Sequence, residues 1–429
     1  MPNPQSDPAT DQSENAAPPG ALATATSNTT TTASTPTAWW AVLSMTLGVF
    51  GLVTAEFLPI SLLTPIADDL HITEGLAGQA ISATALFALI TSLLIATVTR
   101  RFDRRTVLLS FSVLLVISSI MVAMAQSFSF LLLGRVLLGI ALGGFWTMST
   151  ATIMRLVPPQ HIPRGLAIMY SGVSAATVFA APVGSYLGDI ISWRAVFLLA
   201  AGIGAITFVT QLATLPSLPP RGRATLRVLV DLVKRPGMKF GLFSLVLIIT
   251  GHFALFTYVR PFLENVTGVA TAGVSGVLLG FGLANFAGTY LAGTLISRSL
   301  RMTIALMPMI MGLCAIAMVT LDGALTPTVI LVAIWGMAFG GVPVAWSTWI
   351  TRTVPDEAES GGGLVVAGFQ TAIASGAVIG GLLFDFVGSL GVFTIGGLTL
   401  IAAALVVTAV LRPAPAQELD PELDLAEQS

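Results

Sequence analysis

Two ionisable side chains, Glu56 and Arg135, interrupt stretches of sequence that are otherwise apolar. Glu56 lies in VTAEFLPIS, and Arg135 lies in LLLGRVLLG. A charged side chain at the centre of a bilayer costs about 2.5–3.5 kcal/mol on insertion scales, and such residues commonly mark ion or proton pathways. Burial favours the neutral form of a carboxylic acid, whereas a nearby guanidinium favours the charged form. This pair of residue types is therefore suited to taking up and releasing a proton.

The segments that carry these two residues place them at similar depth. If each segment is a helix across the membrane, Glu56 lies about two turns before the end of its helix, and Arg135 about two turns after the start of its own. We predict that Glu56 faces a central cavity, that it is electrostatically coupled to Arg135, and that the two residues carry proton coupling. The alternative is a fixed ion pair that pins the two helices together.

The composition indicates an integral membrane protein. Of the 429 residues, 55% are hydrophobic and only 9% are charged, whereas soluble domains have about 25% charged residues. The net charge is −2 and no basic stripe is present, so nucleic acid is not an expected partner. The single cysteine, Cys314, excludes an intrachain disulfide framework.

The sequence contains no pattern of an enzyme or of a cofactor site. Its two lysines, Lys234 and Lys239, do not follow the glycines of a phosphate-binding loop, which argues against an ATPase. The three histidines, His71, His161 and His252, lack metal-ligand spacing. We therefore expect no catalysis, no metal and no cofactor.

Apolar runs of about 18–25 residues predict an all-α membrane protein with twelve transmembrane helices in two six-helix repeats. The predicted spans are 39–63, 76–98, 107–125, 129–153, 164–188, 194–214, 240–259, 272–297, 303–321, 327–350, 362–384 and 389–411. The predicted domains are a disordered N-terminal tail (1–38), a six-helix bundle (39–214), a basic cytoplasmic linker (215–239), a second six-helix bundle (240–411) and a C-terminal tail (412–429).

The basic residues predict the orientation in the membrane. Most of the 19 Lys and Arg residues fall in connections on the same side as the linker, and only Arg194 and Arg260 fall in connections on the other side. Because cytoplasmic loops carry the excess of Lys and Arg, we expect both termini to be cytoplasmic.

The two halves of the chain resemble each other in sequence. GIALGGFWTMSTATIMRLVP (139–158) aligns with GMAFGGVPVAWSTWITRTVP (336–355) at a constant offset of 197 residues, with Gly, Arg and Pro in register. Glu56-x-x-Pro59 is likewise mirrored by Tyr258-x-x-Pro261. Parallel six-helix repeats of this kind predict a central path between two bundles.

From about residue 39 to 412 the sequence resembles the major facilitator superfamily. Within it, AEFLPISLLTPIADDL, LLLGRVLLGIALGGFWTMS and WSTWITR resemble the bacterial purine ribonucleoside efflux pumps, which belong to the drug:proton antiporter branch. The resemblance places Arg135 at the family's fourth-helix arginine, which is linked there to proton coupling. It therefore implies a proton-coupled exporter that works by alternating access.

The resemblance also indicates residues for gating. ATVTRRFDRR (96–105) occupies the family's gating loop, where Arg104 and Arg105 fit the usual pattern and Asp103 is the available acid for a gate contact. In the predicted fifth helix, Gly172, Pro182, Gly184 and Gly188 match the antiporter motif. They are candidates for a hinge or for plain helix packing. If this helix borders the eighth, the matching surface is expected at Gly276, Gly280 and Gly288.

Several polar or aromatic residues within the spans, or at their ends, are candidates for substrate binding, because a purine base can stack on aromatic rings and a nucleoside can hydrogen-bond to amide groups. They are Trp146, His252, Tyr258, Asn285, Trp346 and Gln370. For each, the alternative role is helix–helix hydrogen bonding or anchoring at the membrane interface.

The sequence thus predicts a secondary active exporter of small organic solutes in a bacterial cytoplasmic membrane. Purine ribonucleosides of the inosine and guanosine type are the expected substrates, and the expected partners are protons and the lipid bilayer, with a monomer as the expected state. Proton-coupled efflux of sugars or drugs is the alternative within the class. An uncoupled facilitator or a membrane receptor is the alternative from another class.

Overall fold

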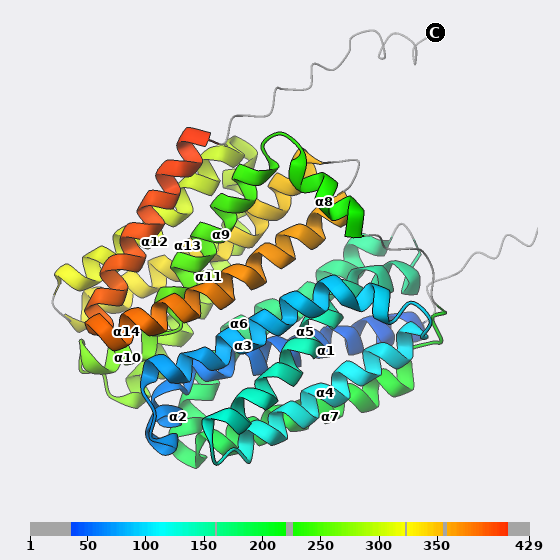
Figure 1. The fold of residues 1–429 in the computed structure, drawn as a ribbon, viewed down its shortest axis with the longest axis horizontal. Coiled ribbons are helices and arrows are strands. Elements are labelled where there is room, and N and C mark those ends of the chain that lie inside the picture. The colour runs from blue at the N-terminus through cyan, green and yellow to red at the C-terminus, as the bar shows by residue number, and fades with distance from the viewer. Residues whose placement is uncertain (1–35, 159–160, 220–225, 322–323, 355–357, 411–429) are drawn as a thin grey trace, which may run out of the picture. The chain divides into compact units, whose positions relative to one another are not determined.

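The computed structural model describes residues 36–158, 161–219, 226–321, 324–354 and 358–410, which form helices joined by short connections (Figure 1). Of the tail predicted over 1–38, only residues 36–38 are described, as the start of the first helix. The tail predicted over 412–429 lies outside the described residues.

Eleven long helices and three short ones make up the described part of the chain. The long helices of the first half are α1 (Pro36–Ser61), α3 (Glu74–Val98), α4 (Arg104–Ala123), α5 (Phe128–Leu156), α6 (Ile162–Ile191) and α7 (Trp193–Thr214). Those of the second half are α9 (Met238–Phe256), α11 (Thr271–Arg298), α12 (Leu300–Thr320), α13 (Leu325–Thr353) and α14 (Ala358–Val410). The short helices are α2 (Leu63–Leu70), α8 (Leu226–Lys234) and α10 (Val259–Asn265).

All eleven long helices are long and apolar enough to cross a membrane. The last of them, α14, contains both of the final predicted spans, 362–384 and 389–411, except for residue 411, which lies outside the described part. The helical path breaks inside α14 at Gly388, where φ is 67° and ψ is −175°. Glycine adopts a positive φ without steric cost, so the chain turns there between two spanning segments. The prediction of an all-α fold with twelve spans is confirmed.

The predicted spans agree with the helices to within a few residues, but the three short helices were not predicted. Their apolar runs are too short to cross a bilayer, and α8 lies in the segment that was predicted as a linker. The short helices α2 and α10 lie at one end of the bundle, and α8 lies at the other (Figure 1). We name these the α2/α10 end and the α8 end.

Helix contacts repeat between the two halves. In the first half α3 packs on α5, α1 on α6, and α4 on α7. The second half has the matching contacts of α11 with α13, α9 with α14, and α12 with α14. Across the halves, α3 lies against α14 and α6 lies against α11 (Figure 1). These two contacts are also equivalent under the repeat, so the halves meet through two related surfaces.

Glycines in the repeated segments let the helices approach closely. A Cβ atom on Gly143 of α5 would lie 2.1 Å from the carbonyl oxygen of Ala88 of α3. A Cβ atom on Gly340 of α13 would lie 1.9 Å from the carbonyl oxygen of Asn285 of α11. The residues of the second contact follow those of the first at the 197-residue offset seen in the sequence. The sequence repeat is therefore a repeat of backbone packing.

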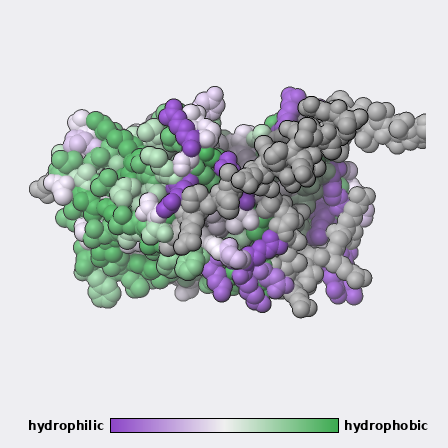
Figure 2. Space-filling model, turned by 90° about the horizontal axis from the view of Figure 1, so that it is seen from above, coloured by the Kyte–Doolittle hydropathy of each residue, from purple (hydrophilic) through white to green (hydrophobic). Residues whose placement is uncertain are grey.

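The surface is suited to lipid. Helix α6 exposes Phe179, Val183, Tyr186 and Ile190 at helical spacing, and hydrophobic residues cover a broad area on one side of the view in Figure 2. Hydrophilic residues gather toward the other side of that view. An apolar stripe of this width on a helix surface indicates contact with the hydrocarbon of a bilayer.

We predict that Gly340→Ala destabilises the fold, because the new methyl group would overlap the carbonyl oxygen of Asn285. Overpacking of this kind costs about 1–3 kcal/mol. Gly280→Ala on α11 is the matched control, since no heavy atom lies within 4 Å of its Cβ position. Thermal unfolding in detergent, followed by the folded fraction on size exclusion, measures both. Equal unfolding temperatures for the two variants would contradict the packing described above.

Candidate functional site

Arg135 lies on α5 and is 1% exposed. Its guanidinium donates hydrogen bonds to three backbone carbonyl oxygens: Nη1 to Ala55 at 2.7 Å, Nη2 to Glu56 at 3.1 Å and Nε to Ala80 at 3.2 Å. The first two acceptors belong to α1 and the third to α3. Arg135 therefore ties α5 to two other helices of the first half.

The carbonyl of Ala55 needs such a donor because of Pro59. Proline has no N–H group, so Pro59, which lies inside α1, cannot bond to the carbonyl four residues earlier. In a membrane no water replaces the missing partner, and an unsatisfied backbone group is costly there. Arg135 supplies the donor, so its first role in this fold is to complete the backbone hydrogen bonds of α1.

Glu56 lies beside this contact and is 6% exposed. Its carboxylate oxygen Oε1 has no hydrogen-bond partner among the described residues. The next residue, Phe57, meets Phe256 of α9 edge-on, with 6.4 Å between the ring centroids. Glu56 is therefore buried next to a contact between the two halves, not exposed to lipid. A buried carboxylate without a partner favours its neutral form, and the charge of Arg135 opposes that preference.

The gating-loop residues make contacts within the first half and the start of the linker. Asp103 caps α4 by accepting a hydrogen bond from the backbone N–H of Arg105 at 2.8 Å. It also accepts from the backbone N–H of Leu218 at 3.0 Å and from the hydroxyl of Ser217. Partial burial acts to raise the pKa of Asp103, but these hydrogen bonds and the charge of Arg155 outweigh it, so the pKa lies below its ordinary value.

The two arginines of this loop bind neighbouring helices. Arg104 Nη1 donates to the hydroxyl of Thr99 at 2.9 Å, and Arg105 Nη2 donates to the carbonyl of Leu212 at 2.7 Å. None of the hydrogen bonds of Asp103, Arg104 and Arg105 in the described part of the chain reaches the second half. A role in gating stays a prediction.

The glycines of the predicted fifth helix, α6, face α1. Cβ atoms on Gly172, Gly184 and Gly188 would lie within 3 Å of atoms of Thr46, Leu58 and Ser61, and Leu62. Pro182 lies within the same helix. These small residues therefore serve the close packing of α6 on the helix that carries Glu56.

Helix α6 also borders α11, but the contact is at a different glycine from the three that were expected. A Cβ atom on Gly282 would lie 2.8 Å from the Cα of Val178. By contrast, Gly276 and Gly280 have no heavy atom near that position, and Gly288 faces Met337 of α13. The expected matching surface at these three glycines is therefore wrong.

The halves separate toward the α8 end. Arg164, Ala167 and Ser171 share the face of α6 that carries Val178, and all three are exposed. On α3, Leu86 and Ile90 continue the face that meets α14 at Gly75, and they are exposed as well. Because faces that are in contact near the α2/α10 end are uncovered further along, the space between the halves opens toward the α8 end.

His252 lies in an aromatic cluster of the second half. It is completely buried, its ring stacks on Phe339 at 3.5 Å, and its Nδ1 accepts a hydrogen bond from Trp335 Nε1 at 3.1 Å. Because Nδ1 is an acceptor, the ring proton of neutral His252 is on Nε2, for which no partner is present among the described residues. Phe253, Phe256 and Phe281 also contact the His252 ring.

The other predicted substrate residues lie apart from it. Tyr258 Oη lies 3.2 Å from the carbonyl oxygens of Gly75 and Ala377, at the contact between the halves. Trp346 is buried beside Trp349 on α13, and Trp146 stacks on Tyr170 of α6. Asn285 and Gln370 are buried on α11 and α14, and Gln370 Oε1 has no partner among the described residues.

Within the described part of the chain, no hydrogen bond or ring contact joins any two of these six residues. Their role in binding stays a prediction. Sequence reasoning missed Tyr170, which stacks on Trp146 and is 46% exposed. Its exposure depends on how the halves are arranged, which a local pattern does not contain.

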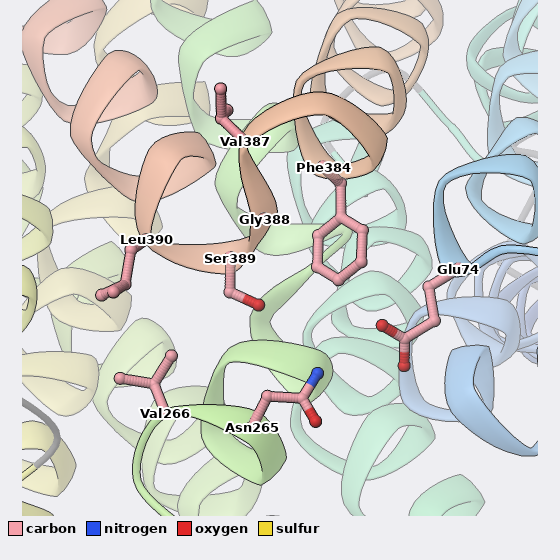
Figure 3. A pocket seen from close by; sticks show the side chains of 8 residues that line it. All are labelled: Glu74, Asn265, Val266, Phe384, Val387, Gly388, Ser389 and Leu390. Atoms are coloured by element: carbon pink, nitrogen blue, oxygen red, sulfur yellow. The ribbon is translucent and has the colours of Figure 1, made fainter.

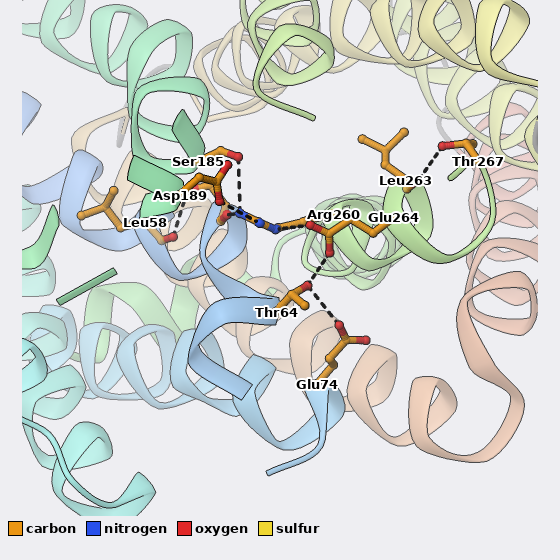
Figure 4. Close-up of polar contacts among 10 residues, drawn as sticks. Leu58, Thr64, Glu74, Ser185, Asp189, Arg260, Leu263, Glu264 and Thr267 are labelled. Carbon is orange, nitrogen blue, oxygen red and sulfur yellow. Dashed lines mark hydrogen bonds and ion pairs between the residues drawn. The ribbon is translucent and has the colours of Figure 1, made fainter. Parts of the chain in front are cut away.

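Sequence reasoning also missed a polar network that joins the halves at the α2/α10 end (Figure 4). Its centre is Arg260 of α10, which was assigned to a connection but is only 2% exposed. Arg260 binds Glu264 on its own helix and Asp189 on α6. The spacing of four residues between Arg260 and Glu264 was the available signal.

A pocket of about 380 Å³ adjoins this network (Figure 3). It is lined by Glu74 of α3, by Asn265 and Val266 at the end of α10, and by residues around the break in α14. Those residues are Phe384, Val387, Gly388, Ser389 and Leu390. The pocket therefore lies where the first half meets the second.

Comparison with known proteins identifies close relatives of the chain. A family model described as Major Facilitator Superfamily matches residues 45–365. The purine ribonucleoside efflux pump NepI of Salmonella enteritidis is 42% identical over 377 residues, which cover 88% of this chain and 95% of that protein. The NepI protein of Salmonella typhi matches with the same identity and coverage.

Solved structures share the fold. The crystal structure of a bacterial homolog of the human lysosomal transporter Spinster, in an inward-facing and unoccupied conformation, matches with a TM-score of 0.68 and 16% identity, over 88% of this chain and 96% of that one. The occupied form of the same homolog matches with a TM-score of 0.66 and 17% identity, over 90% and 100%.

The contacts of Asp103 predict a pH-dependent contribution to stability. Because its folded-state pKa is lowered, Asp103 stabilises the fold above its ordinary pKa of about 3.9, and this contribution is lost as the pH falls through the lowered value. Asparagine keeps the N-cap, but its neutral oxygen accepts weaker hydrogen bonds from Ser217 and Leu218. At neutral pH, Asp103→Asn should therefore destabilise the protein by about 1 kcal/mol, and the difference should shrink in acid.

Thermal unfolding of the two proteins at several pH values measures this effect. Ser299→Ala is the matched control, because Ser299 caps α12 with a hydroxyl that does not titrate. Its cost should not change with pH. A cost of Asp103→Asn that is constant down to acid pH would show that the charge of Asp103 plays no part.

Proposed function

The chain belongs to the Major Facilitator Superfamily and is a multi-pass membrane transporter, and from this premise we propose that it exports purine ribonucleosides against an inward flow of protons. The observation that supports the choice of substrate is the 42% identity to NepI over 88% of this chain. The observation that supports proton coupling is a buried acid, Glu56, next to a contact between the two halves.

Glu56 is proposed to bind the transported proton. Its carboxylate has one oxygen without a hydrogen-bond donor, and the fixed charge of Arg135 lies nearby. Any motion that changes the access of water to this group changes its affinity for a proton. If proton and substrate favour opposite protonation states of Glu56, a proton that enters drives a substrate out.

The energetics of this exchange are sufficient for export. A proton-motive force of about 200 mV supplies ~4.6 kcal/mol for each proton. This free energy supports a substrate gradient of roughly a thousandfold. Arg135 does not need to move in this scheme, because its hydrogen bonds to the carbonyls of α1 hold Glu56 in place.

Alternating access is proposed to occur by rocking of the two halves about the contacts of α3 with α14 and of α6 with α11. Most basic residues, among them Arg100, Arg101 and Lys234, lie at the α8 end. The excess of positive charge supports a cytoplasmic location for that end, and hence for both termini. In this orientation the described conformation is open to the cytoplasm, where substrate would enter.

Trp146 and Tyr170 are proposed to bind the purine base. Their rings stack at 5.9 Å with an interplanar angle of 25°, and Tyr170 is exposed toward the α8 end. A base that stacks on the free face of Tyr170 would extend this pair. Gln370 is a candidate hydrogen-bond partner, because its buried Oε1 is an acceptor without a donor among the described residues.

We predict that everted membrane vesicles take up labelled inosine when their interior is acidic, and that a protonophore abolishes this uptake. Glu56→Gln should reduce the gradient-driven uptake at least about tenfold, because an amide does not exchange a proton at this pH. Asp231→Asn on the exposed surface of α8 is the matched control and should retain full uptake.

Each of the other outcomes would overturn a different part of this proposal. Full gradient-driven uptake by Glu56→Gln, at equal amounts in the membrane, would remove Glu56 as the coupling acid. Uptake that ignores the protonophore would support an uncoupled facilitator. Uptake of sugars or drugs in place of inosine would keep the proton exchange but overturn the proposed substrate.

A further inference from the structure

The α2/α10 end is held closed by polar contacts that cross between the halves. Arg260 of α10 donates through Nη1 to the carbonyl of Ser61, and to the hydroxyl of Ser185 at 3.3 Å. Its Nη2 lies 3.3 Å from Asp189 Oδ1, and its Nε lies 2.8 Å from Glu264 Oε1. Ser61, Ser185 and Asp189 belong to the first half. Arg260 thus bridges the two halves from a position that is almost fully buried.

A second bridge in the same network depends on a hydroxyl group. Thr64 Oγ1 of α2 lies 2.7 Å from Glu264 Oε2 of α10 and 3.0 Å from Glu74 Oε1 of α3 (Figure 4). A hydroxyl carries one proton and can donate it to one acceptor, and an ionised carboxylate has no proton to give. Both contacts are hydrogen bonds only if one of the two glutamates is protonated and donates to Thr64.

The charges around this bridge favour the extra proton. Among the described residues, Arg260 is the cation that contacts this network, and the network contains several acidic groups. Glu74 (α3) and Glu264 (α10) repel each other, and Asp68 (α2) adds a further negative charge near Glu74. Asp189 (α6) binds Arg260, and Asp385 (α14) accepts a hydrogen bond from Thr73, the residue before Glu74. Asp69 is paired with Arg194, and His71 is exposed at the end of α2. Adding a proton therefore relieves repulsion between like charges.

A route for the proton lies beside the bridge. The pocket of about 380 Å³ is lined by Glu74 and opens between α3, α10 and the break in α14 (Figure 3). Glu74 is partly exposed, whereas Arg260 behind it is buried. Because Glu74 lines this pocket and Glu56 does not, a proton has a route to Glu74 that is separate from Glu56.

We propose that Thr64, Glu74 and Glu264 form a proton-dependent latch that holds the α2/α10 end closed. With Glu74 protonated, its carboxyl donates to Thr64 Oγ1 and the Thr64 hydroxyl donates to Glu264, which joins α2 and α3 to α10. When that proton is lost, two carboxylates from opposite halves compete for a single donor and repel each other, and the end opens. The latch acts separately from Glu56, so it does not depend on which residue couples protons to export.

The sign and size of its effect follow from proton linkage. The closed state binds one more proton than the open state, so acid favours closure. The ratio of closed to open molecules should change by up to about tenfold for each pH unit in the range where the latch titrates.

Spin-label distances measure the opening directly. Labels at Gln126→Cys, between α4 and α5, and at Leu325→Cys, at the start of α13, report on the two halves at this end. Both positions are exposed, and the buried Cys314 is replaced by alanine in the full-length protein in nanodiscs. Distance distributions are recorded from about pH 5 to about pH 9.

In the protein with native latch residues, we expect the shorter distance to gain population as the pH falls. Glu74→Gln keeps a donor for Thr64 but does not titrate, so it should show the shorter distance at every pH. Thr64→Val keeps the side-chain shape but removes the hydroxyl that joins the two glutamates, so it should weaken the closed state and reduce the pH response. Asp231→Asn removes an exposed acid of α8, at the other end of the bundle, and it should respond like the parent protein.

If the distance distribution of the parent protein does not change with pH, the latch proposal is overturned. This test does not depend on any substitution in the latch. A normal pH response in Thr64→Val or in Glu74→Gln would overturn it as well. If Thr64→Val does not fold, the parent titration and Glu74→Gln decide the question.

Discussion

The fold of the first half depends on one backbone carbonyl. Pro59 leaves the carbonyl of Ala55 without its helical donor, and the surrounding bilayer offers no water to replace it. Arg135 supplies the missing donor through a charged hydrogen bond, of a kind that contributes about 1.5–3 kcal/mol. Together with the hydrogen bond from Nη2 to the carbonyl of Glu56, this contact ties α1 to α5 and keeps a positive charge beside Glu56.

The second half has a proline, Pro261, at the position that corresponds to Pro59, but accommodates it differently. The position that corresponds to Arg135 at the 197-residue offset is Val332, whose side chain has no donor. There α9 ends at Phe256 and α10 begins at Val259, so that Pro261 falls in the first turn of a new helix, where its missing N–H costs little. The break gives α10 the freedom to bring Arg260 to the first half. The repeat therefore produces a buried charge in each half, but at different places and with different partners.

The sequence was sufficient to predict the spans, the repeat and the burial of Glu56 and Arg135, because each of these depends on local apolar length or on spacing. It could not predict the partners of Arg135, since a guanidinium can bind a carboxylate or a carbonyl, and only packing decides which. For the same reason Arg260 was assigned to a connection, and Gly282 was overlooked in favour of neighbouring glycines. Contacts between the halves join residues about 100 to 300 positions apart, and no periodicity encodes them.

The central claim is that Glu56 gives up a proton when substrate binds, and proton release by the purified protein tests it most directly. Inosine is added to the transporter in weakly buffered detergent solution, and the released protons are measured with a pH indicator. We expect release from the unmodified protein and none from Glu56→Gln, with inosine bound to both. Equal release from both proteins, or binding to the unmodified protein without any release, would contradict it.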